Sequence, residues 1–303
     1  MVVIEASGLT KHYGETVGLE GLDLRVEQGE VFGFLGPNGA GKTTTIRLLL
    51  DLIRPTRGSA SLFGRPSGEP EVRSRVGYLP GELFLEGRMT GFTTLRFLDR
   101  LRAEGAPPSS ERRRNQLCER LGLGASDLER KVRGYSRGMK QKLGLVAALQ
   151  HDPDLLILDE PTTGLDPLVR EAVFEILDEA GGSGKTVFHS SHVLTEVDRT
   201  CTRVGIVRSG RLLKVLSIDE IRHTSARRMV VHFVGPAPLD ELDLAGVELL
   251  ERDHERVVLR VSGQLDPLLG VLARHPLRDL TFPESSLEET FVEFYRSDRP
   301  EEK

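Results

Sequence analysis

The sequence has no apolar run of the roughly 18 to 20 residues that a membrane-spanning helix needs. Its apolar stretch at 48–53 is interrupted by Asp51, and the stretch at 155–158 ends at Asp159. The N-terminus also lacks a basic segment followed by a long apolar one, which is the pattern of a secretory signal. We therefore expect a cytoplasmic protein that does not itself cross a bilayer.

Cysteine is also scarce, and the sequence has no excess of positive charge. Cys118 and Cys201 are the only cysteines among 303 residues, and their spacing fits neither a disulfide framework nor a zinc site. The formal net charge is −5, and residues 217–303 alone carry −7, from 11 Lys/Arg and 18 Asp/Glu. The one basic cluster, 112–114, is interpreted as a solvated helix face or loop. No nucleic-acid partner is expected from this balance.

The order of apolar segments indicates the fold class. Short buried strands are expected at 29–36, 154–158 and 186–188, and helical patterns follow them at 43–52, about 168–179 and 193–198. Strands that alternate with helices predict an α/β fold with parallel strands at its centre.

Two further segments differ from this alternation. Residues of about 89–150 show helical repeats without a convincing strand, so we expect a helical subdomain inserted into a first domain of residues 1–216. Residues 217–303 read as a small accessory α+β domain.

Within the accessory domain, a strand is expected at 256–261 and a helix at 265–274. A last helix is expected at 287–295, where Ser286 and Glu289 form a capping-box pattern.

The strongest chemical signal is GPNGAGKT, which fits GxxxxGK[ST] between a predicted strand and a predicted helix. Glycines let consecutive backbone N–H groups point at phosphate oxygens, and the helix N-terminus adds positive potential. Lys42 is expected to neutralise the β and γ phosphates, and the Thr43 hydroxyl to bind Mg²⁺. The alternative is a glycine-rich turn with an incidental lysine. The residues expected to bind the nucleotide here are Gly36, Pro37, Asn38, Gly39, Ala40, Gly41, Lys42, Thr43 and Thr44.

A second signal is LLILDEP, a buried strand that ends in two carboxylates. Asp159 is placed to hold Mg²⁺ at the edge of the phosphate site. Glu160, one residue further, could act as the general base for the water that attacks the γ-phosphate. The alternative interpretation is that these two acidic residues after the strand only mark the start of a helix.

These motifs together resemble the nucleotide-binding subunits of ATP-binding cassette (ABC) transporters, over about residues 1–215. The family signature, usually LSGGQ, stands here as YSRGM, in which Ser136 and Gly138 match, whereas Arg137 and Met139 depart. The resemblance implies a P-loop NTPase cassette whose signature residues bind, in trans, the γ-phosphate of ATP held by the other subunit.

Further matches follow in the order of the family. Asp166, in GLDP, resembles the D-loop residue that couples the two sites of a dimer, and His192 resembles the switch histidine, with a catalytic role. Tyr13 resembles the aromatic residue that stacks on adenine, and a packed tyrosine is the alternative.

One position departs from the family pattern. The Q-loop glutamine should close VGYLP at position 81, which is Gly81, followed by Glu82. Our hypothesis is that Glu82 partly substitutes as a ligand in the metal shell, or that the contact is missing.

The resemblance implies an ATPase that uses ATP and Mg²⁺ and forms a head-to-tail homodimer. It implies a motor subunit, peripheral on the inner face of the cell membrane, that drives export of a drug, antibiotic or lipid-like substrate through a separate integral membrane permease. The sequences GMKQKL and SSLEETFVEFY are similar to those of bacterial drug and antibiotic exporters.

Two alternatives remain open. One is a soluble ABC ATPase that acts on nucleic acid or ribosomes, although the sequence lacks the long coiled coil or second cassette usual there. The other is an ATP-binding regulatory module without turnover, against which Glu160 and His192 argue.

Overall fold

The computed structural model describes residues 1–102, 109–220, 227–262 and 264–282. The chain divides into two compact units, Met1–Leu216 (unit 1) and Ser217–Lys303 (unit 2), and each is described by itself.

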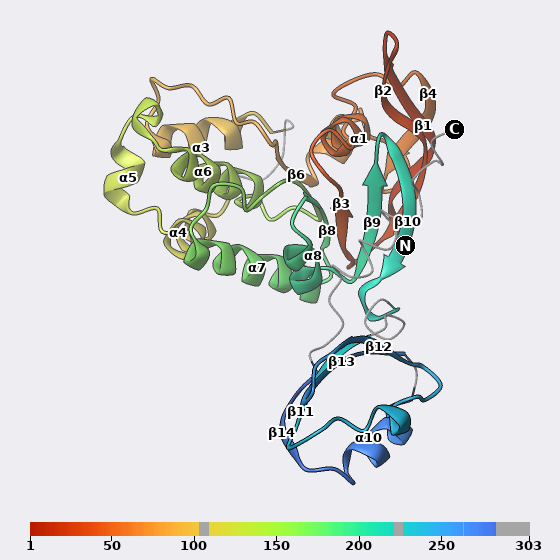
Figure 1. Ribbon diagram of the computed structural model, residues 1–303. Coiled ribbons are helices and arrows are strands. Elements are labelled where there is room, and N and C mark those ends of the chain that lie inside the picture. The colour runs from red at the N-terminus through yellow and green to blue at the C-terminus, as the bar shows by residue number, and fades with distance from the viewer. Residues whose placement is uncertain (103–108, 221–226, 263, 283–303) are drawn as a thin grey trace. The chain divides into compact units, whose positions relative to one another are not determined.

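A six-stranded, mainly parallel sheet forms the centre of unit 1 (Figure 1). Its strands in spatial order are β10 (Arg211–Ser217), β9 (Arg203–Arg208), β3 (Val31–Leu35), β8 (Thr186–Ser191), β7 (Leu155–Asp159) and β6 (Val76–Leu79). β9, β3, β8, β7 and β6 pair in parallel. Every residue of β3, β7 and β8 is buried, as expected of strands covered on both faces.

Helices follow the strands as the alternation predicts. α1 (Lys42–Leu49) follows β3, α7 (Pro167–Gly182) follows β7, and α8 (Leu194–Thr200) follows β8, so the predicted α/β class is confirmed. α1 ends before the predicted boundary because Asp51 has a φ of 53°, in the left-handed region that an α-helix excludes. β8 runs on to Ser191 because its parallel pairing with β3 continues to that residue.

An antiparallel sheet, not anticipated from the sequence, also belongs to unit 1. Its order is β2 (Thr16–Glu27), β1 (Val2–Tyr13), β4 (Arg57–Leu62) and β5 (Arg65–Pro66). Register shifts and glycines at positive φ, Gly8 and Gly21, break the period of two in β1 and β2. Leu9 and Leu19 nevertheless share one buried core with Ile46 of α1.

Helices occupy much of the segment in which the sequence predicts a helical insertion. The helices between β5 and β7 are α2 (Pro70–Arg73), α3 (Gly91–Arg100), α4 (Glu111–Arg120), α5 (Ala125–Glu129), the 3₁₀-helix η1 (Val132–Gly134) and α6 (Arg137–Leu149). Thr90, Ser110 and Ser136 cap α3, α4 and α6, because each hydroxyl accepts a hydrogen bond from the N–H three residues on. Within the described ranges, none of the helices combines the length and apolar character needed to cross a membrane.

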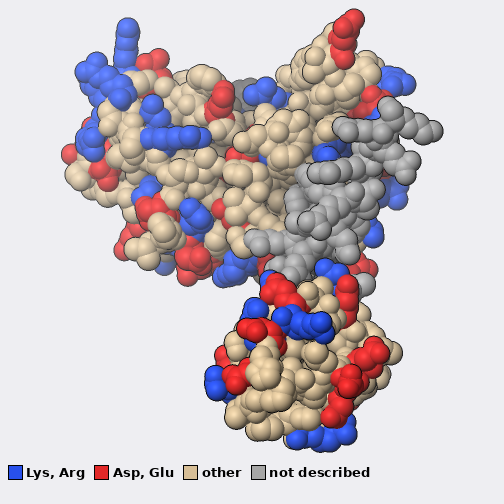
Figure 2. Space-filling view, viewed as in Figure 1, with Lys and Arg blue, Asp and Glu red and all other residues tan. Residues whose placement is uncertain are grey.

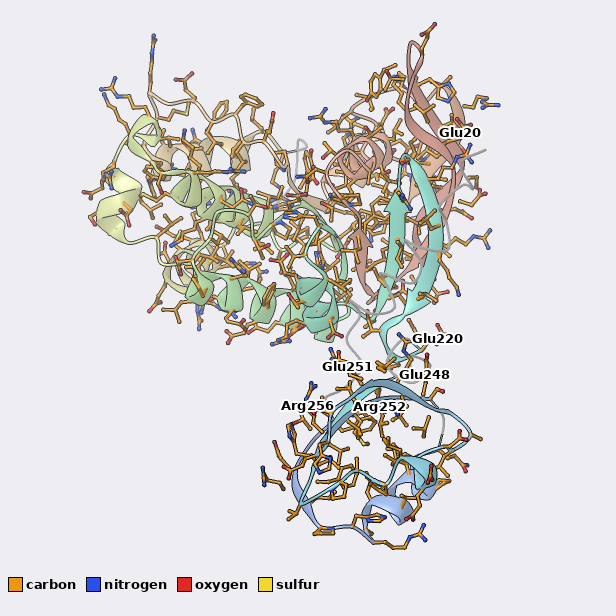
Figure 3. All side chains as sticks on the ribbon, viewed as in Figure 1. Glu20, Glu220, Glu248, Glu251, Arg252 and Arg256 are labelled. Atoms are coloured by element: carbon orange, nitrogen blue, oxygen red, sulfur yellow. The ribbon has the colours of Figure 1, made fainter. Side chains whose placement is uncertain are left out.

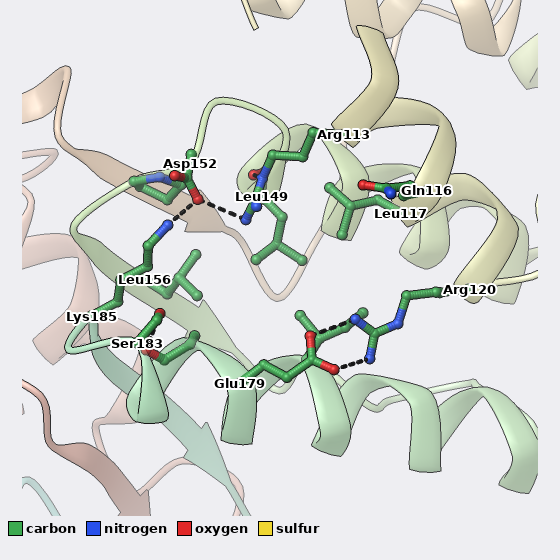
Figure 4. A pocket seen from close by; sticks show the side chains of 13 residues that line it. Arg113, Gln116, Leu117, Arg120, Leu149, Asp152, Leu156, Glu179, Ser183 and Lys185 are labelled. Carbon is green, nitrogen blue, oxygen red and sulfur yellow. Dashed lines mark hydrogen bonds and ion pairs between the residues drawn. The ribbon is translucent and has the colours of Figure 1, made fainter. Parts of the chain in front are cut away.

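A pocket of about 410 Å³ lies between α4 and α7 (Figure 4). Arg120 of α4 donates two parallel hydrogen bonds to Glu179 of α7, at 2.6 and 2.9 Å. Asp152 pairs with Arg113 at 2.9 Å and also with Lys185. Because these side chains are partly exposed, each pair is expected to contribute no more than about 1 kcal/mol. The ion pairs join α4 to α7 and to Asp152 across the pocket.

The described residues of unit 2 form a four-stranded antiparallel sheet, a 3₁₀-helix and an α-helix. The strand order is β12 (Val247–Arg252), β13 (Arg256–Val261), β11 (Arg227–Phe233) and β14 (Leu277–Thr281), with η2 (Leu239–Glu241) and α10 (Asp266–Leu272). β13 has the predicted bounds, and α10 lies within the predicted helix 265–274. The helix predicted at 287–295, with Ser286 and Glu289, lies outside the described residues.

Alternating side chains give the sheet of unit 2 two different faces. One set of apolar residues from β11 and β13 is buried together with α10. On the other face, charged side chains form ion pairs, in which Glu251 contacts Arg228 at 3.0 Å and Arg256 at 3.2 Å, and Glu248 contacts Arg260 at 3.1 Å. Figure 3 labels Glu248, Glu251 and Arg256. Figure 2 accordingly shows acidic and basic side chains intermixed on the visible face of this unit.

His189 is a buried titratable residue in the middle of β8, only 2% exposed. Its Nε2 lies 3.0 Å from both Thr200 Oγ1 and Cys201 Sγ, and its Nδ1 has no hydrogen-bond partner among the described groups. Burial opposes the charged imidazolium and lowers the pKa of His189 to about 4, from an ordinary value of 6.5.

We expect this histidine to make unit 1 sensitive to acid. Between pH 6.5 and 4 the unfolded chain binds a proton that the folded chain excludes, so the free energy of unfolding falls as the pH falls through this window. The loss should approach about 2 kcal/mol at pH 4.5. Denaturant unfolding of the native chain and of His189→Leu at pH 7 and pH 4.5 measures it. The same pH dependence in both proteins would contradict the assignment.

Candidate functional site

The sequence GPNGAGKT, residues 36–43 (the phosphate loop), connects β3 to α1, so that its backbone N–H groups precede a helix N-terminus as phosphate binding requires. Gly39 and Gly41 have φ values of 79° and 104°, which favour glycine. A Cβ at Gly36 would lie 2.3 Å from the carbonyl oxygen of Val207, and one at Gly41 would lie 2.7 Å from that of Gly18. The loop therefore needs glycine both for its conformation and for its close approach to neighbouring backbone.

Lys42, the first residue of α1, is 5% exposed and turns its ammonium group back into the loop. The Nζ atom donates to the carbonyl oxygens of Gly36 at 2.8 Å and Pro37 at 3.1 Å. It also pairs with Glu160 Oε1 at 3.2 Å. A buried cation is thus held where phosphate oxygens would meet the loop.

Thr43 and Asp159 meet beside this lysine. The Thr43 hydroxyl donates to Asp159 Oδ2 at 2.7 Å, and the Ser190 hydroxyl donates to Oδ1 at 2.6 Å. A hydroxyl and a carboxylate are oxygen ligands of the kind that Mg²⁺ prefers, together with water and phosphate. In the described part of the chain no group of three or more His, Cys, Asp or Glu could hold a metal by itself. The pair therefore fits an ion that is bound partly through a nucleotide.

Glu160 follows β7 in a strained conformation, with a φ of 51°. A non-glycine residue in this region costs of the order of 1 kcal/mol and is typical of functional sites. Its Oε1 lies 3.2 Å from Lys42 Nζ and 3.3 Å from His192 Nδ1. Burial of the carboxyl favours its neutral form, but the Lys42 ammonium, with a smaller contribution from the neighbouring His192, outweighs burial and holds the pKa of Glu160 below its usual value.

His192 directly follows β8, and its side chain is 43% exposed. β7 and β8 are adjacent parallel strands, so their carboxyl ends bring Glu160 and His192 together. A carboxylate and an imidazole at this distance can orient or deprotonate one water molecule. The predicted catalytic pair is thus brought into contact.

The predicted signature residues lie at the start of α6. Ser136 caps this helix, and Arg137 is exposed in its first turn. Gly138 lies against Gly164, because a Cβ at Gly138 would be 2.8 Å from the carbonyl oxygen of Gly164. Among the described side chains, none of the hydrogen bonds or ion pairs joins Ser136 or Arg137 to the phosphate loop.

The predicted D-loop residue Asp166 caps α7, and its Oδ1 accepts a hydrogen bond from Val169 N at 3.0 Å. This backbone hydrogen bond lowers the pKa of Asp166. Lys142 of α6 lies 3.8 Å from the same carboxylate. The signature helix and the D-loop are therefore neighbours within one chain.

Tyr13, at the end of β1, is 48% exposed. A Cβ at Gly18 would lie 2.8 Å from the Tyr13 ring, and Gly18 in turn contacts Gly41 of the phosphate loop. The ring is therefore near the loop and open to solvent, as a residue that stacks on a base must be.

Gly81 lies directly beside Asp159. A Cβ at Gly81 would be 2.9 Å from Asp159 Oδ2, so a larger residue requires this carboxylate or the backbone to shift. Glu82 is exposed, and no described contact joins it to Thr43 or Asp159. Its role as a metal-shell ligand stays a prediction.

Further polar residues complete the site but were not singled out from the sequence. Ser190 accepts from Glu160 N at 3.0 Å, and Gln141 Nε2 donates to Glu160 O at 3.2 Å. Thr162 and Glu196 are joined by a hydrogen bond of 2.8 Å. The polar residues at the end of β8, just before His192, are a sequence pattern that indicates Ser190. Gln141 lies inside an amphipathic helix, where no sequence pattern distinguishes it from other polar residues.

Comparison with known proteins identifies the family. A family model described as ABC transporter matches residues 19–163, which include the phosphate loop, the signature and Glu160. The daunorubicin resistance ATP-binding protein DrrA3 of Streptomyces coeruleorubidus is 36% identical over 98% of this chain and 96% of its own. The chain belongs to the ABC transporter family. ATP is the ligand that such cassettes bind.

Two further similar proteins match a smaller part of this chain. An uncharacterised ABC transporter ATP-binding protein of Nostoc sp. is 44% identical, but the match covers 68% of this chain and 62% of that protein. A solved structure of the ATP-binding subunit of an ABC transporter has a TM-score of 0.65 and 31% identity, and covers 73% of this chain and 92% of its own. The cassette fold is therefore shown for the larger part of the chain.

We expect Glu82→Ala to lower the Mg²⁺-dependent rate of ATP hydrolysis several-fold, because a carboxylate in the metal shell would be lost. Steady-state phosphate release over a range of Mg²⁺ concentrations measures this. Glu86→Ala, an exposed glutamate of the same segment, is the control. Unchanged kinetics in Glu82→Ala would mean that the Q-loop contact is simply missing.

Proposed function

We propose that this protein hydrolyses Mg·ATP as the motor subunit of an exporter. The observation that carries the proposal is the meeting of Lys42, Asp159, Glu160 and His192 at the carboxyl edge of one parallel sheet. This edge of the sheet carries a side chain suited to each of three tasks: binding phosphate, binding a metal ion and activating water.

The reaction would use these groups in separate roles. The loop N–H groups and Lys42 would bind the phosphates, and Thr43 and Asp159 would hold Mg²⁺, which when bound neutralises charge on the phosphate oxygens. A γ-phosphate would compete with Glu160 for the Lys42 ammonium, now 3.2 Å from that carboxylate. Glu160, freed from this ion pair, would accept a proton from the attacking water, and His192 would orient that water.

Two copies would act together, head to tail. Ser136 and Arg137 stand at the exposed start of α6, where a helix N-terminus and a hydroxyl suit an anion. Binding of ATP between Lys42 of one copy and Ser136 of the other would favour a closed dimer, and hydrolysis would release it. Asp166 and Tyr13 would contribute the coupling contact and the adenine contact.

The similarity to DrrA3, a daunorubicin resistance ATP-binding protein, over nearly the whole chain supports an exporter of drug-like or antibiotic molecules. The transport pathway would belong to a separate integral membrane permease. The chain would then work in the cytoplasm, peripheral on the inner face of the membrane, with closure of its dimer driving the permease.

Replacement of the proposed base tests the enzyme. We expect Glu160→Gln to lower kcat at least a hundredfold, because an amide cannot accept the proton of water, while ATP still binds. Phosphate release and the affinity for a fluorescent ATP analogue are the two measurements. Glu171→Gln, an exposed glutamate of α7, serves as control. The proposal fails if the native chain, with and without a permease, releases no phosphate.

The head-to-tail arrangement can be tested by complementation. Lys42→Ala and Ser136→Ala should each inactivate a homodimer, but a mixed dimer of the two should regain activity. One of its two composite sites would carry both defects and the other neither. If sites were built within one chain, every site of the mixture would be defective and no activity would return.

A further inference from the structure

Glu196 is a buried acidic residue to which the proposed mechanism assigns no role. It lies on α8 and is 7% exposed. Its Oε1 accepts a hydrogen bond from the Thr162 hydroxyl and its Oε2 one from the Ser191 hydroxyl, each at 2.8 Å. Arg170 and His192 line the same pocket, but among the described residues Glu196 forms no ion pair with either of them. Burial of a carboxyl group without an ion pair costs stability, so a role beyond packing is expected.

The two hydroxyls belong to the two loops that carry the proposed catalytic residues. Thr162 follows Glu160 by two positions after β7, and Ser191 immediately precedes His192 at the end of β8. Glu160 and His192 themselves are 3.3 Å apart. The carboxyl group of Glu196 therefore closes a ring of contacts that joins both loops behind the catalytic pair.

The residues of this ring line part of a small pocket, which Arg170 also lines. It has a volume of about 210 Å³, and Glu160, Thr162, Ser191, His192 and Glu196 are among its lining residues. A cavity of this size and polarity has room for water beside the Glu160 carboxylate. The position of the two loops would therefore determine how Glu160 and His192 face a water molecule bound in this pocket.

We propose that Glu196 is a positioning residue that holds Glu160 and His192 in their catalytic geometry. This inference rests on the proposed ATPase function. Glu196 acts through Thr162 and Ser191 and does not itself contact substrate. A displacement of about 1 Å in such a pair is sufficient to cost a large part of the rate.

Two substitutions separate positioning from a role of the charge. Glu196→Ala removes the bridge, so kcat should fall at least tenfold while the KM for ATP and the affinity for an ATP analogue stay within about twofold. Glu196→Gln can keep it, because its carbonyl oxygen accepts from one hydroxyl and its amide donates to the other. We expect Glu196→Gln to restore kcat to within about threefold of the native value.

Other outcomes overturn the inference. An unchanged kcat in Glu196→Ala would leave Glu196 without a catalytic role, and equal loss in the Ala and Gln variants would assign the effect to its charge. Thr195→Ala is the matched control, because Thr195 is the preceding, exposed residue of the same helix. Near-UV circular dichroism and thermal unfolding check that each variant is folded.

A second set of variants keeps the test decisive where Glu196→Ala fails to fold. Thr162→Val removes one hydroxyl and keeps the shape of the side chain, and Ser191→Ala removes the other. If both act through Glu196, kcat in the double variant should fall by less than the product of the two single effects. If the effects of the two single substitutions on kcat simply multiply in the double variant, the two hydroxyls act independently, which would contradict the proposed ring of contacts. A native chain that releases no phosphate would refute the proposed function, whereas native turnover with an unaffected Glu196→Ala refutes only the role of Glu196.

Discussion

The parallel pairing of β3, β7 and β8 is the constraint on which the site depends. Leu35 at the end of β3 pairs with Ser191 of β8, and Asp159 at the end of β7 pairs with Ser190. Chain segments more than a hundred residues apart therefore end at one edge. The phosphate loop, the acidic pair and the histidine follow these strand ends, so one sheet edge collects the groups for phosphate, metal and water.

Charge balance at this edge explains how the buried groups can coexist. Glu160 is held between the Lys42 ammonium and His192, and Asp159 between the hydroxyls of Thr43 and Ser190. Each contact satisfies a group that burial alone would destabilise. The left-handed backbone of Glu160 is tolerated because Gln141 and Ser190 hold its peptide groups from both sides.

Much of the fold and the site could be predicted where the signal is local. Lys42 and Glu160 lie in short motifs directly after continuous apolar strands, and parallel strands align their carboxyl ends. The sheet of β1, β2, β4 and β5 could not be predicted, because bulges and glycines such as Gly8 interrupt its alternation. The position of Gly81 against Asp159 also depends on pairing between β6 and β7, which the sequence leaves open.

The sequence by itself determined which chemical groups this protein possesses and the order in which strands, loops and helices present them. Only the tertiary structure decided which of these groups touch. The contact between Thr162 and Glu196 joins residues 34 positions apart, and that between Thr43 and Asp159 joins residues 116 apart. The period of a helix or a strand in the sequence reveals only contacts within one element. These two contacts join separate elements that pack together at the sheet edge, so no local pattern predicts them.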